Sequence, residues 1–284
     1  MTAQFTLKPD AAVDLHMHTT YSDGRWPAQR LIDYLAEQGF DLVAVTDHDR
    51  VDKVAEIQAL AAAKNLPVLP GVEMSTQWHG HVAHLLCYGF DPAQSALKPL
   101  TEKIVALQLE NTHEVNEELR KRGYDFPRQE ALLAEHDGKL HRPSDNAYLL
   151  MEHQHTSDWQ TAMRMIREAG FHSILATMGE AVEAAHQSGA TCIMAHPGRR
   201  DSNFTYYDTA LLDQLRAEVP IDGIEVYHPY HNEESRQMYL DYVNKHNLLL
   251  STGSDSHGIA SRMPIKYRAE TSRPLLARLG VTVA

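Results

Sequence analysis

The sequence predicts an α/β protein in which strands and helices form a closed or nearly closed barrel, interrupted by a mostly helical insertion. Short β-rich runs alternate with helical stretches near both ends of the chain, about seven runs have the pattern of strands, and the alternation stops between residues 92 and 178. Alternation of this kind implies parallel strands covered by helices. A length of 284 residues suits one large domain, or one domain with an insert.

The first part of the chain contains four strand candidates and two helical stretches. Leu31, Ile32 and Leu35 fall on one face of a helix, and Val54 and Ile57 are spaced in the same way. The predicted strands are Val13–Met17, Leu42–Thr46, Pro67–Glu73 and His84–Phe90, and the predicted helices are Ala28–Gln38 and Val51–Lys64.

The last part of the chain repeats this alternation. The predicted strands are Thr191–Ala195, Gly223–Tyr227 and Leu248–Thr252, and the predicted helices are Ala210–Ala217 and Glu233–Lys245.

The middle of the chain has a different pattern. Val105, Val115 and Leu119 belong to a long helical stripe, and no convincing strand follows it for many residues. We therefore expect a barrel made of residues 1–91 and 179–284, with residues 92–178 as a helical insertion that covers the barrel mouth.

Composition narrows the class of protein. Lys and Arg number 26 and Asp and Glu 38, so the net charge is −12, which argues against a broad basic groove for nucleic acid. No apolar run reaches the roughly 18 residues of a membrane span, and Lys8 and Asp10 interrupt the region where a signal peptide would be apolar. Cys87 and Cys192 lie in apolar runs and predict buried free thiols. We expect a soluble, cytoplasmic protein.

The 18 histidines are the unusual feature of this composition. His16 and His18 end the first predicted strand, and residues two apart in a strand project to the same side. In α/β barrels the carboxyl ends of the strands carry the active site. Two imidazoles are therefore expected to project together at this end.

Other predicted strands also carry His, Asp or Glu at their ends. Together with His16 and His18 the candidates are Asp23, His48, Glu73, His84, His196, Asp255 and His257. A single histidine at a strand end is more often structural than a ligand, but nine candidates at one rim predict a metal centre. Imidazole and carboxylate ligands without a thiol favour Mn²⁺, Zn²⁺ or Fe²⁺ over Ca²⁺, and Mn²⁺ is the first choice.

These motifs resemble those of the polymerase-and-histidinol-phosphatase (PHP) family of metal-dependent phosphoesterases. In chain order they are HisMetHis, SerAspGly, ThrAspHisAsp, GlyValGlu, AlaHisPro and SerAspSerHis, within residues 12–90 and 190–258. Ala195–Arg199, Glu225–Pro229 and the Arg142–Pro143 pair resemble most the subgroup of nucleoside 3′,5′-bisphosphate phosphatases and 5′–3′ exoribonucleases. That subgroup usually has His after the ArgPro pair, where this chain has Ser144.

The resemblance implies a distorted seven-stranded barrel with two or three divalent metal ions. One metal would take His16, His18, Glu73 and Asp255. A second would share Glu73 and add His84 and His196. A third would take Asp23, His48 and His257. Three divalent ions and three carboxylates leave about +3 in the cleft, so an acidic protein can hold a small phosphorylated substrate there.

Catalytic and substrate-binding roles follow from the same motifs. We expect in-line attack of a metal-bridging hydroxide on phosphorus, with Glu73, Asp255 and His228 as the catalytic residues and His228 as the proton donor. The substrate-binding candidates are Arg142, Arg199 and Ser144, with Arg200 as a weaker one.

Two assignments keep alternatives. His79 and His81 form a second HisXHis motif that competes with His84, which we favour because it leads directly into an apolar run. Asp47 and Asp49 either orient metal-bound imidazoles or cap the following helix.

The leading interpretation is a phosphomonoesterase that removes the 3′-phosphate of a nucleoside 3′,5′-bisphosphate. The same site could instead cleave short RNA from its 5′ end, or act on another small phosphoester such as histidinol phosphate. From a different class, the chain could be a binding module with a degenerate metal site. We expect a small nucleotide partner or short RNA, with no duplex DNA and no membrane.

Overall fold

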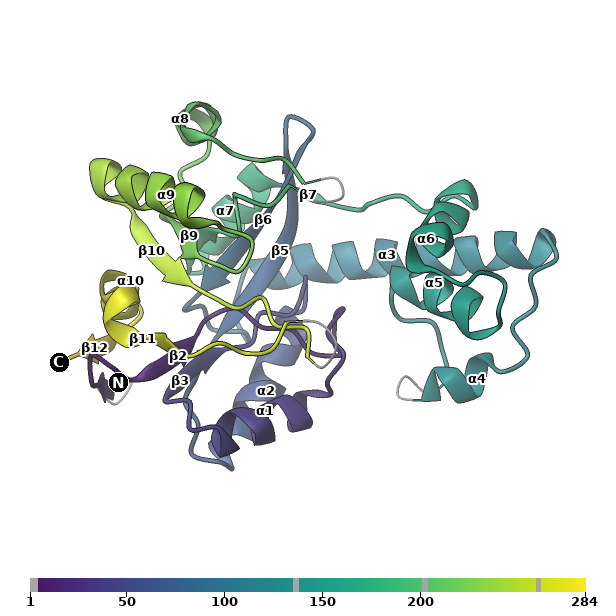
Figure 1. Ribbon diagram of the computed structural model, residues 1–284, viewed down its shortest axis with the longest axis horizontal. Helices are drawn as coiled ribbons and strands as arrows, with labels where there is room; N and C mark the ends of the chain where they lie inside the picture. The colour runs from purple at the N-terminus through teal and green to yellow at the C-terminus, as the bar shows by residue number, and fades with distance from the viewer. Residues whose placement is uncertain (1–4, 135–137, 201–203, 259–261) are drawn as a thin grey trace. The chain divides into compact units, whose positions relative to one another are not determined.

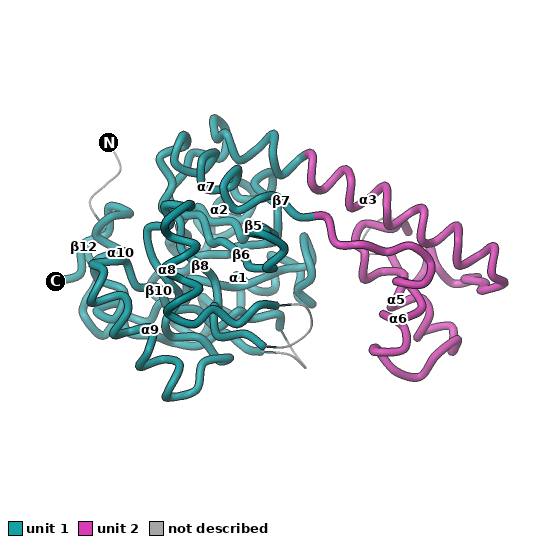
Figure 2. The backbone as a smooth tube through the Cα atoms, turned by 90° about the horizontal axis from the view of Figure 1, so that it is seen from above, with its two compact units in different colours: residues 1–102, 175–284 teal, residues 103–174 magenta. Residues whose placement is uncertain are grey.

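The computed structural model describes residues 5–134, 138–200, 204–258 and 262–284. The chain divides into two compact units (Figure 2): unit 1 comprises Met1–Glu102 and Leu175–Ala284, and unit 2 comprises Lys103–Ile174. No helix among these described residues is both long and apolar enough to cross a membrane.

Unit 1 is an α/β structure with mixed sheets, which confirms the predicted class (Figure 1). Its strands are β1 (Phe5–Leu7), β2 (Ala12–Asp14), β3 (Leu42–Ala44), β4 (Val68–Leu69), β5 (Gly71–Trp78), β6 (His81–Tyr88), β7 (Ala176–Thr177), β8 (Thr191–Met194), β9 (Gly223–Tyr227), β10 (Leu249–Thr252), β11 (Tyr267–Arg268) and β12 (Val281–Val283). Its helices are α1 (Ala28–Glu37), α2 (Val54–Ala62), α7 (Met178–Gln187), α8 (Thr209–Glu218), α9 (Glu233–His246) and α10 (Arg273–Arg278).

The hydrogen-bonded ladders of the described strands form three sheets. Their orders are β10-β9-β8-β6-β5-β7, β11-β2-β3-β4 and β1-β12. These ladders do not show the predicted closed barrel. Isolated parallel bridges between Met17 and Ser256 and between His48 and Glu73 connect the segments that follow β2 and β3 to the six-stranded sheet. The two bridges bring the candidate site residues of both sheets together.

The prediction of uniformly parallel strands is wrong at the centre of the large sheet. β5 pairs antiparallel with β6, and β6 pairs antiparallel with β8. Glu73 was expected to end a strand and His84 to begin one, but each lies inside a strand of this long hairpin. Ser75, Thr76 and Gln77 extend β5 beyond the predicted end at Glu73, and their backbone groups pair with β6.

Other expected boundaries differ by smaller amounts. The first strand ends at Asp14, so His16 and His18 follow the ladder and are held by the Met17 bridge. The predicted strand Pro67–Glu73 divides between β4 and β5. β9 has the predicted bounds. α1, β8, β10 and α9 differ from theirs by one residue at one end, and α8 by one residue at each end.

Alternating apolar residues build the core of unit 1. Leu15, Ile193 and Leu86 belong to one buried cluster inside the sheets, while Leu31 and Ile32 of α1 pack in a second cluster beneath the helices. Cys87 and Cys192 are buried free thiols, as predicted.

Unit 2 is helical and has its own core. Its helices are α3 (Leu97–Lys121), which begins in unit 1, α4 (Gln129–Leu132), α5 (Pro143–Glu152) and α6 (Trp159–Glu168). Val115 and Leu119 of the predicted stripe are buried in this core. Asp158 caps α6 by accepting the N–H of Thr161, and Pro143 begins α5, where a missing N–H costs nothing.

Candidate metal centre

The two histidines of the HisMetHis motif project together, as the strand periodicity predicts. Nε2 of His16 lies 3.2 Å from Nε2 of His18. Met17 between them points the other way, into the cluster beneath α1. Both imidazoles are buried, with relative exposures of 0% and 1%, so they face the interior of the site and not solvent.

Glu73 lies at the centre of the histidines. Its Oε2 is 2.9 Å from His16 Nε2, 3.0 Å from His18 Nε2 and 3.5 Å from His48 Nε2. Its Oε1 lies 3.1 Å from His84 Nδ1 and 3.0 Å from His196 Nε2. The two oxygens of this fully buried carboxylate therefore face different imidazoles. A carboxylate in that position has the geometry to bridge two ions.

Asp255 completes a four-residue group with His16, His18 and Glu73, whose donor atoms all lie within 4.8 Å of one another. Asp255 Oδ1 is 3.2 Å from His18 Nε2 and 3.6 Å from His16 Nε2. The backbone at Asp255 has a φ of 50°, a conformation that non-glycine residues rarely adopt. Such strain is typical of functional sites, where the surroundings hold a side chain in place.

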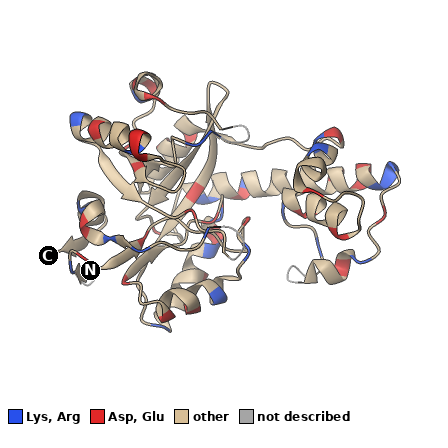
Figure 3. Ribbon diagram, in the orientation of Figure 1, with Lys and Arg blue, Asp and Glu red and all other residues tan. Residues whose placement is uncertain are grey.

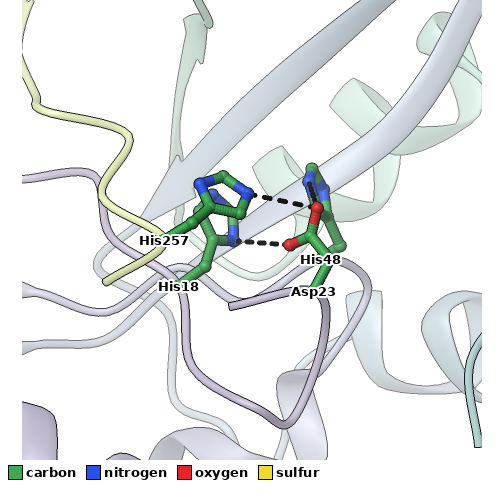
Figure 4. A group of neighbouring side chains, drawn as sticks. All are labelled: His18, Asp23, His48 and His257. Atoms are coloured by element: carbon green, nitrogen blue, oxygen red, sulfur yellow. Dashed lines mark ion pairs between the residues drawn. The ribbon is translucent and has the colours of Figure 1, made fainter. Parts of the chain in front are cut away.

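A second group lies at the edge of the first. Figure 4 shows His18, Asp23, His48 and His257 pointing toward one another, and their donor atoms lie within 4.8 Å. His257 Nε2 is 3.1 Å from Asp23 Oδ2, and His48 Nε2 is 3.9 Å from the same oxygen. The Asp23 side chain is 46% exposed, so this group is the more open of the two.

The protonation states of several residues suit metal binding. Burial lowers the pKa of His48 to about 3 and that of His196 to about 4, so both imidazoles are neutral at pH 7 and offer a lone pair. Burial alone would raise the pKa of Glu73, but the charges of His16 and its neighbours hold it well below the usual value. Glu73 is therefore ionised, as a ligand must be.

His16 and His18 differ from the other histidines. Burial opposes their protonation, but Glu73 and Asp255 outweigh it and raise the pKa of His18 to about 10. The pKa of His16 is raised well above its ordinary value by Glu73 and Glu225. Protons on these two imidazoles balance the buried carboxylates of the metal-free protein, and a divalent cation would replace them.

Residues around the cluster orient it. Glu225 Oε1 lies 2.9 Å from His16 Nδ1, and its Oε2 accepts the backbone N–H of His196. A carboxylate that holds the second ring nitrogen of a ligating histidine fixes the tautomer and raises the basicity of the ligand. Glu225 lies inside β9, and in the sequence it stands out only as part of the Glu225–Pro229 motif.

Asp47 and Asp49 do not serve as helix caps in the structure. Asp47 accepts hydrogen bonds from the backbone N–H and hydroxyl of Thr19 and from the hydroxyl of Ser22. Asp49 accepts the backbone N–H of Ser75. The helical turn that follows shows no side-chain cap. The two carboxylates therefore tie together the loops that carry the cluster.

The competition among histidines resolves in favour of His84, which lies beside Glu73. His79 lies in the turn between β5 and β6, where its Nε2 is 2.7 Å from Glu218 Oε2. His81 Nδ1 lies 3.3 Å from the Thr205 hydroxyl.

The donor set fits a cluster of divalent ions. Six imidazoles and three carboxylates converge without a thiol, most of them buried, which is the environment of Mn²⁺, Zn²⁺ or Fe²⁺ sites. The profile of the PHP domain family matches residues 14–169. The chain belongs to the PHP domain family.

Two curated relatives of this PHP protein span most of its length. It is 30% identical over 251 residues to the 3′,5′-nucleoside bisphosphate phosphatase of Chromobacterium violaceum, covering 87% of each chain. It is 28% identical to the 5′-3′ exoribonuclease of Haemophilus influenzae, covering 86% of this chain and 89% of that one. A solved structure from Bifidobacterium adolescentis has a TM-score of 0.81 and 24% identity, covers 96% of this chain and 98% of its own, and shows likeness of fold.

The remaining predicted site residues of this PHP protein are distributed over both units. His228 lies beside the cluster, with its Nε2 3.5 Å from Asp255 Oδ2. The Arg199 guanidinium stacks over Phe204 at 3.8 Å, and Phe204 packs edge-on against His84 and His196. Arg142 and Ser144 lie at the start of α5 in unit 2, where Arg142 pairs with Asp145 at 3.0 Å.

One positively charged side chain beside the metal-ligand candidates, that of Arg262, was not predicted from the sequence. Arg262 reaches Asp255 Oδ2 at 2.5 Å with its Nη2 and donates to the Tyr230 hydroxyl with its Nη1. It follows the last motif by five residues, and no spacing rule marks it. Its position soon after the SerAspSerHis motif was the only feature of the sequence that could have pointed to it.

Proposed function

We propose that this protein is a metal-dependent phosphomonoesterase that removes the 3′-phosphate of nucleoside 3′,5′-bisphosphates. The observation that carries the proposal is the buried carboxylate of Glu73, whose two oxygens face five imidazoles. The relative from Chromobacterium violaceum, which is named for this substrate class, supports the choice of substrate.

The proposed ligands divide into three sets, and Glu73 belongs to two of them. His16, His18, Glu73 and Asp255 would hold one ion, Glu73, His84 and His196 a second, and Asp23, His48 and His257 a third, with Mn²⁺ preferred. Bound divalent ions supply Lewis acidity toward the phosphoryl oxygens and lower the pKa of a water nucleophile.

His228 is our candidate for the proton donor. The backbone N–H of Tyr230 donates to its Nδ1 at 3.0 Å, so the ring proton of a neutral His228 lies on Nε2. That atom is on the side of Asp255. Water attacks phosphorus in line and the bond between phosphorus and the 3′-oxygen breaks. His228 Nε2 gives its proton to the departing oxygen, and the proton that the attacking water releases restores the neutral imidazole.

Two arginines beside the cluster are candidates for binding the substrate. Arg199 stacks between Phe204 and Tyr230, with its guanidinium 3.8 Å and 5.0 Å from the two ring centres, so its planar donors are held in one orientation. Arg262 approaches the other side of the cluster through Asp255. Guanidinium groups bind phosphate oxygens in pairs. We assign Arg199 to the second phosphate and Arg262 to the phosphate that is cleaved.

A pocket of about 450 Å³ beside His228 suits the nucleoside. Its lining includes Tyr206, Tyr230 and Arg200, and the Tyr230 ring stacks on His228 with 5.2 Å between ring centres. The volume lies within the range of small-molecule sites, about 300–1,000 Å³. Arg142 and Ser144 of the helical insertion, residues 92–178, stay candidates for substrate binding on the strength of their sequence motif.

The charge distribution favours a small substrate. Lys and Arg are interspersed with Asp and Glu along the helices of both units (Figure 3), and the net charge is −12. Long polyanions bind through many phosphate contacts to basic surfaces. A short ligand held by a local cluster needs no such surface.

Release of products tests the proposal. Protein supplied with Mn²⁺ should liberate inorganic phosphate and adenosine 5′-phosphate from adenosine 3′,5′-bisphosphate. A short 5′-phosphorylated RNA should yield mononucleotides more slowly.

Faster stepwise cleavage of the RNA than of the bisphosphate would favour the second candidate function, a 5′–3′ exoribonuclease, which the Haemophilus influenzae relative supports. If the protein hydrolyses histidinol phosphate but neither the bisphosphate nor the RNA, the assignment of a nucleotide substrate is wrong. If no substrate is hydrolysed and the protein binds less than one equivalent of metal, the protein is instead a binding module with a degenerate metal site.

A further inference from the structure

Cys87 and Cys192 face each other across two neighbouring strands, away from the metal centre. β6 and β8 are antiparallel, and Cys87 is the register partner of Cys192. The Ala195 N–H donates to the His84 carbonyl at 3.0 Å. Because hydrogen-bonded and non-hydrogen-bonded pairs alternate along an antiparallel ladder, Cys87 and Cys192 form a non-hydrogen-bonded pair, with Cα atoms about 4.5 Å apart. Their two thiols are therefore adjacent.

The thiols lie on the face of the sheet that α7 contacts. Leu86, Tyr88 and Ile193 point into the opposite core cluster, and residues one position along a strand point to the other face. α7 packs against both β6 and β8. A side chain from the end of α7 can therefore meet the cysteines.

His186 on α7 and Asp222 before β9 supply a nitrogen and an oxygen at this place. His186 Nε2 lies 2.9 Å from Asp222 Oδ2, which also accepts the Cys192 N–H at 2.8 Å. The donor atoms of His186, Cys192 and Asp222 all lie within 4.8 Å of one another. Cys87 lies outside this group, so it could supply a fourth ligand only after its side chain turns toward the other three. The His186 and Asp222 side chains are 36% and 25% exposed, whereas both cysteines are buried, so the group has a route to solvent.

We propose that Cys87, Cys192, His186 and Asp222 form a second metal site, separate from the Glu73 centre, for one Zn²⁺ or a similar thiophilic divalent ion. Two thiolates, one imidazole and one carboxylate are a four-coordinate donor set that zinc accepts. The Glu73 centre has no thiol, so the two sites differ in the softness of their ligands. This proposal does not depend on the phosphatase activity.

Binding would exchange protons for metal bonds. Each thiol releases its proton to solvent as a metal–sulfur bond forms. His186 Nε2 gives up the proton it shares with Asp222, leaving a neutral ring protonated on Nδ1, and one metal–nitrogen and one metal–oxygen bond replace that hydrogen bond. The hydrogen bond with Cys87 and burial both raise the pKa of the Cys192 thiol. The metal must therefore displace firmly held protons, and the apparent affinity is expected to rise with pH.

Co²⁺ binding to the full-length reduced protein tests the site. Co²⁺ bound by thiolate gives a sulfur-to-metal charge-transfer band in the near ultraviolet, whereas histidine and carboxylate ligands do not. Because the chain has two cysteines, such a band reports this site whatever the Glu73 centre holds. We expect one equivalent of Co²⁺ to produce the band, a rise in affinity with pH, and loss of the band on addition of Zn²⁺.

Variants identify the donors. C192S and C87S should each abolish or strongly reduce the band. H186Q and D222N alter partly exposed residues and should weaken Co²⁺ binding by at least about tenfold. H79Q is the matched control, because His79 pairs with Glu218 at 2.7 Å far from any cysteine, and it should bind Co²⁺ as the unaltered chain does.

Two results would overturn the site. One is absence of the band in reduced protein whose circular dichroism shows it folded. The other is an undiminished affinity in both H186Q and D222N, since the two thiols would then bind the metal without the proposed partners.

Discussion

At the scale of single residues, Glu73 has the most demanding position. It is fully buried, and five imidazoles surround its two oxygens. Glu73→Gln keeps the volume but removes the charge and one acceptor oxygen. We expect phosphate release to fall by at least about 100-fold with loss of bound metal, measured by product formation and metal analysis of the same preparation.

The control for this variant is Glu218→Gln. Glu218 also contacts a histidine, His79, but lies on the surface away from the cluster. It should leave activity unchanged. Full activity in Glu73→Gln would contradict the bridging role.

Glu225 acts through His16 and not on the substrate. Its Oε1 lies 2.9 Å from His16 Nδ1. Glu225→Gln should lower metal affinity by about 10–100-fold, while saturating metal restores most of kcat. An activity titration with Mn²⁺ separates the two effects. A fall in kcat that no metal concentration repairs would instead indicate a direct role in the reaction or a misfolded site.

Residue types in ordered motifs were sufficient to predict which ligand candidates gather, although Glu73 and His84 lie inside β5 and β6 and not at strand ends. Glu225 and Arg262 were not predictable in the same way. Glu225 occupies an ordinary strand position, and its role arises only when β9 lies beside the His16 segment. Arg262 contacts Asp255 Oδ2, and no motif in the sequence marks it for that role.

At the scale of elements, the positions of strands and helices were predictable, but which strands pair with one another was not. β9 has the predicted bounds and α1 differs by one residue, since local apolar periodicity determines them. The pairing of β5 with β6 depends on the turn at His79 and Gly80, which have φ values of 48° and 82°. This hairpin pairs two strands antiparallel where the alternation of strands and helices along the chain predicts parallel pairing.

The end of β10 makes a further prediction at this scale. A Cβ on Gly253 would lie 2.3 Å from His16 Cβ and 2.4 Å from Glu225 Oε1, so this glycine allows the strand to pass close to the cluster. Gly253→Ala should destabilise the fold by about 1–3 kcal/mol and displace the His16–Glu225 pair, lowering metal affinity. Denaturant unfolding and Mn²⁺ titration measure the two effects.

Gly179→Ala is the matched control for that change. A Cβ at Gly179 meets nothing within 4 Å, and the residue lies in α7. Alanine there should leave stability unchanged or raise it by up to about 1 kcal/mol. Equal behaviour of the two alanine variants would show that the close approach at Gly253 is unimportant.

At the scale of the whole molecule, the closed barrel stays a prediction. The ladders form separate sheets, joined through the Met17–Ser256 and His48–Glu73 bridges. Such single bridges depend on contacts between segments that are distant in sequence, which no periodicity describes. The helical character of the middle segment was predictable because Val115 and Leu119 lie on one apolar face.

Buried histidines make the stability of the metal-free protein depend on pH. Burial lowers the pKa of His48 to about 3, and of His196 and His231 to about 4. Between these values and the unfolded value of 6.5 the unfolded chain binds more protons, so stability falls as the pH falls. Asp14 opposes them, because burial raises its pKa to about 6 and the folded state binds its proton. Three groups against one leave a net loss on acidification.

The alkaline side follows from His16 and His18. The pKa of His18 is about 10 and that of His16 is also raised, so their contribution to stability is complete below pH 6.5 and is lost as the pH rises toward the folded values. Metal-free protein in a chelator should therefore be most stable near pH 6.5. From pH 6 to 5 the free energy of unfolding should fall by about 2 kcal/mol.

Denaturant unfolding at pH 5, 6.5 and 8 measures this profile. Adding Mn²⁺ should remove the loss at pH 8, because the metal takes the place of the protons on His16 and His18. It should deepen the loss at pH 5, where protons compete more strongly with the metal for these two imidazoles. Greater stability of the metal-free protein at pH 8 than at 6.5 would mean that these two imidazoles are neutral in the folded state. The buried carboxylates would then need another counterion, and the charge balance inferred for the Glu73 centre would be wrong.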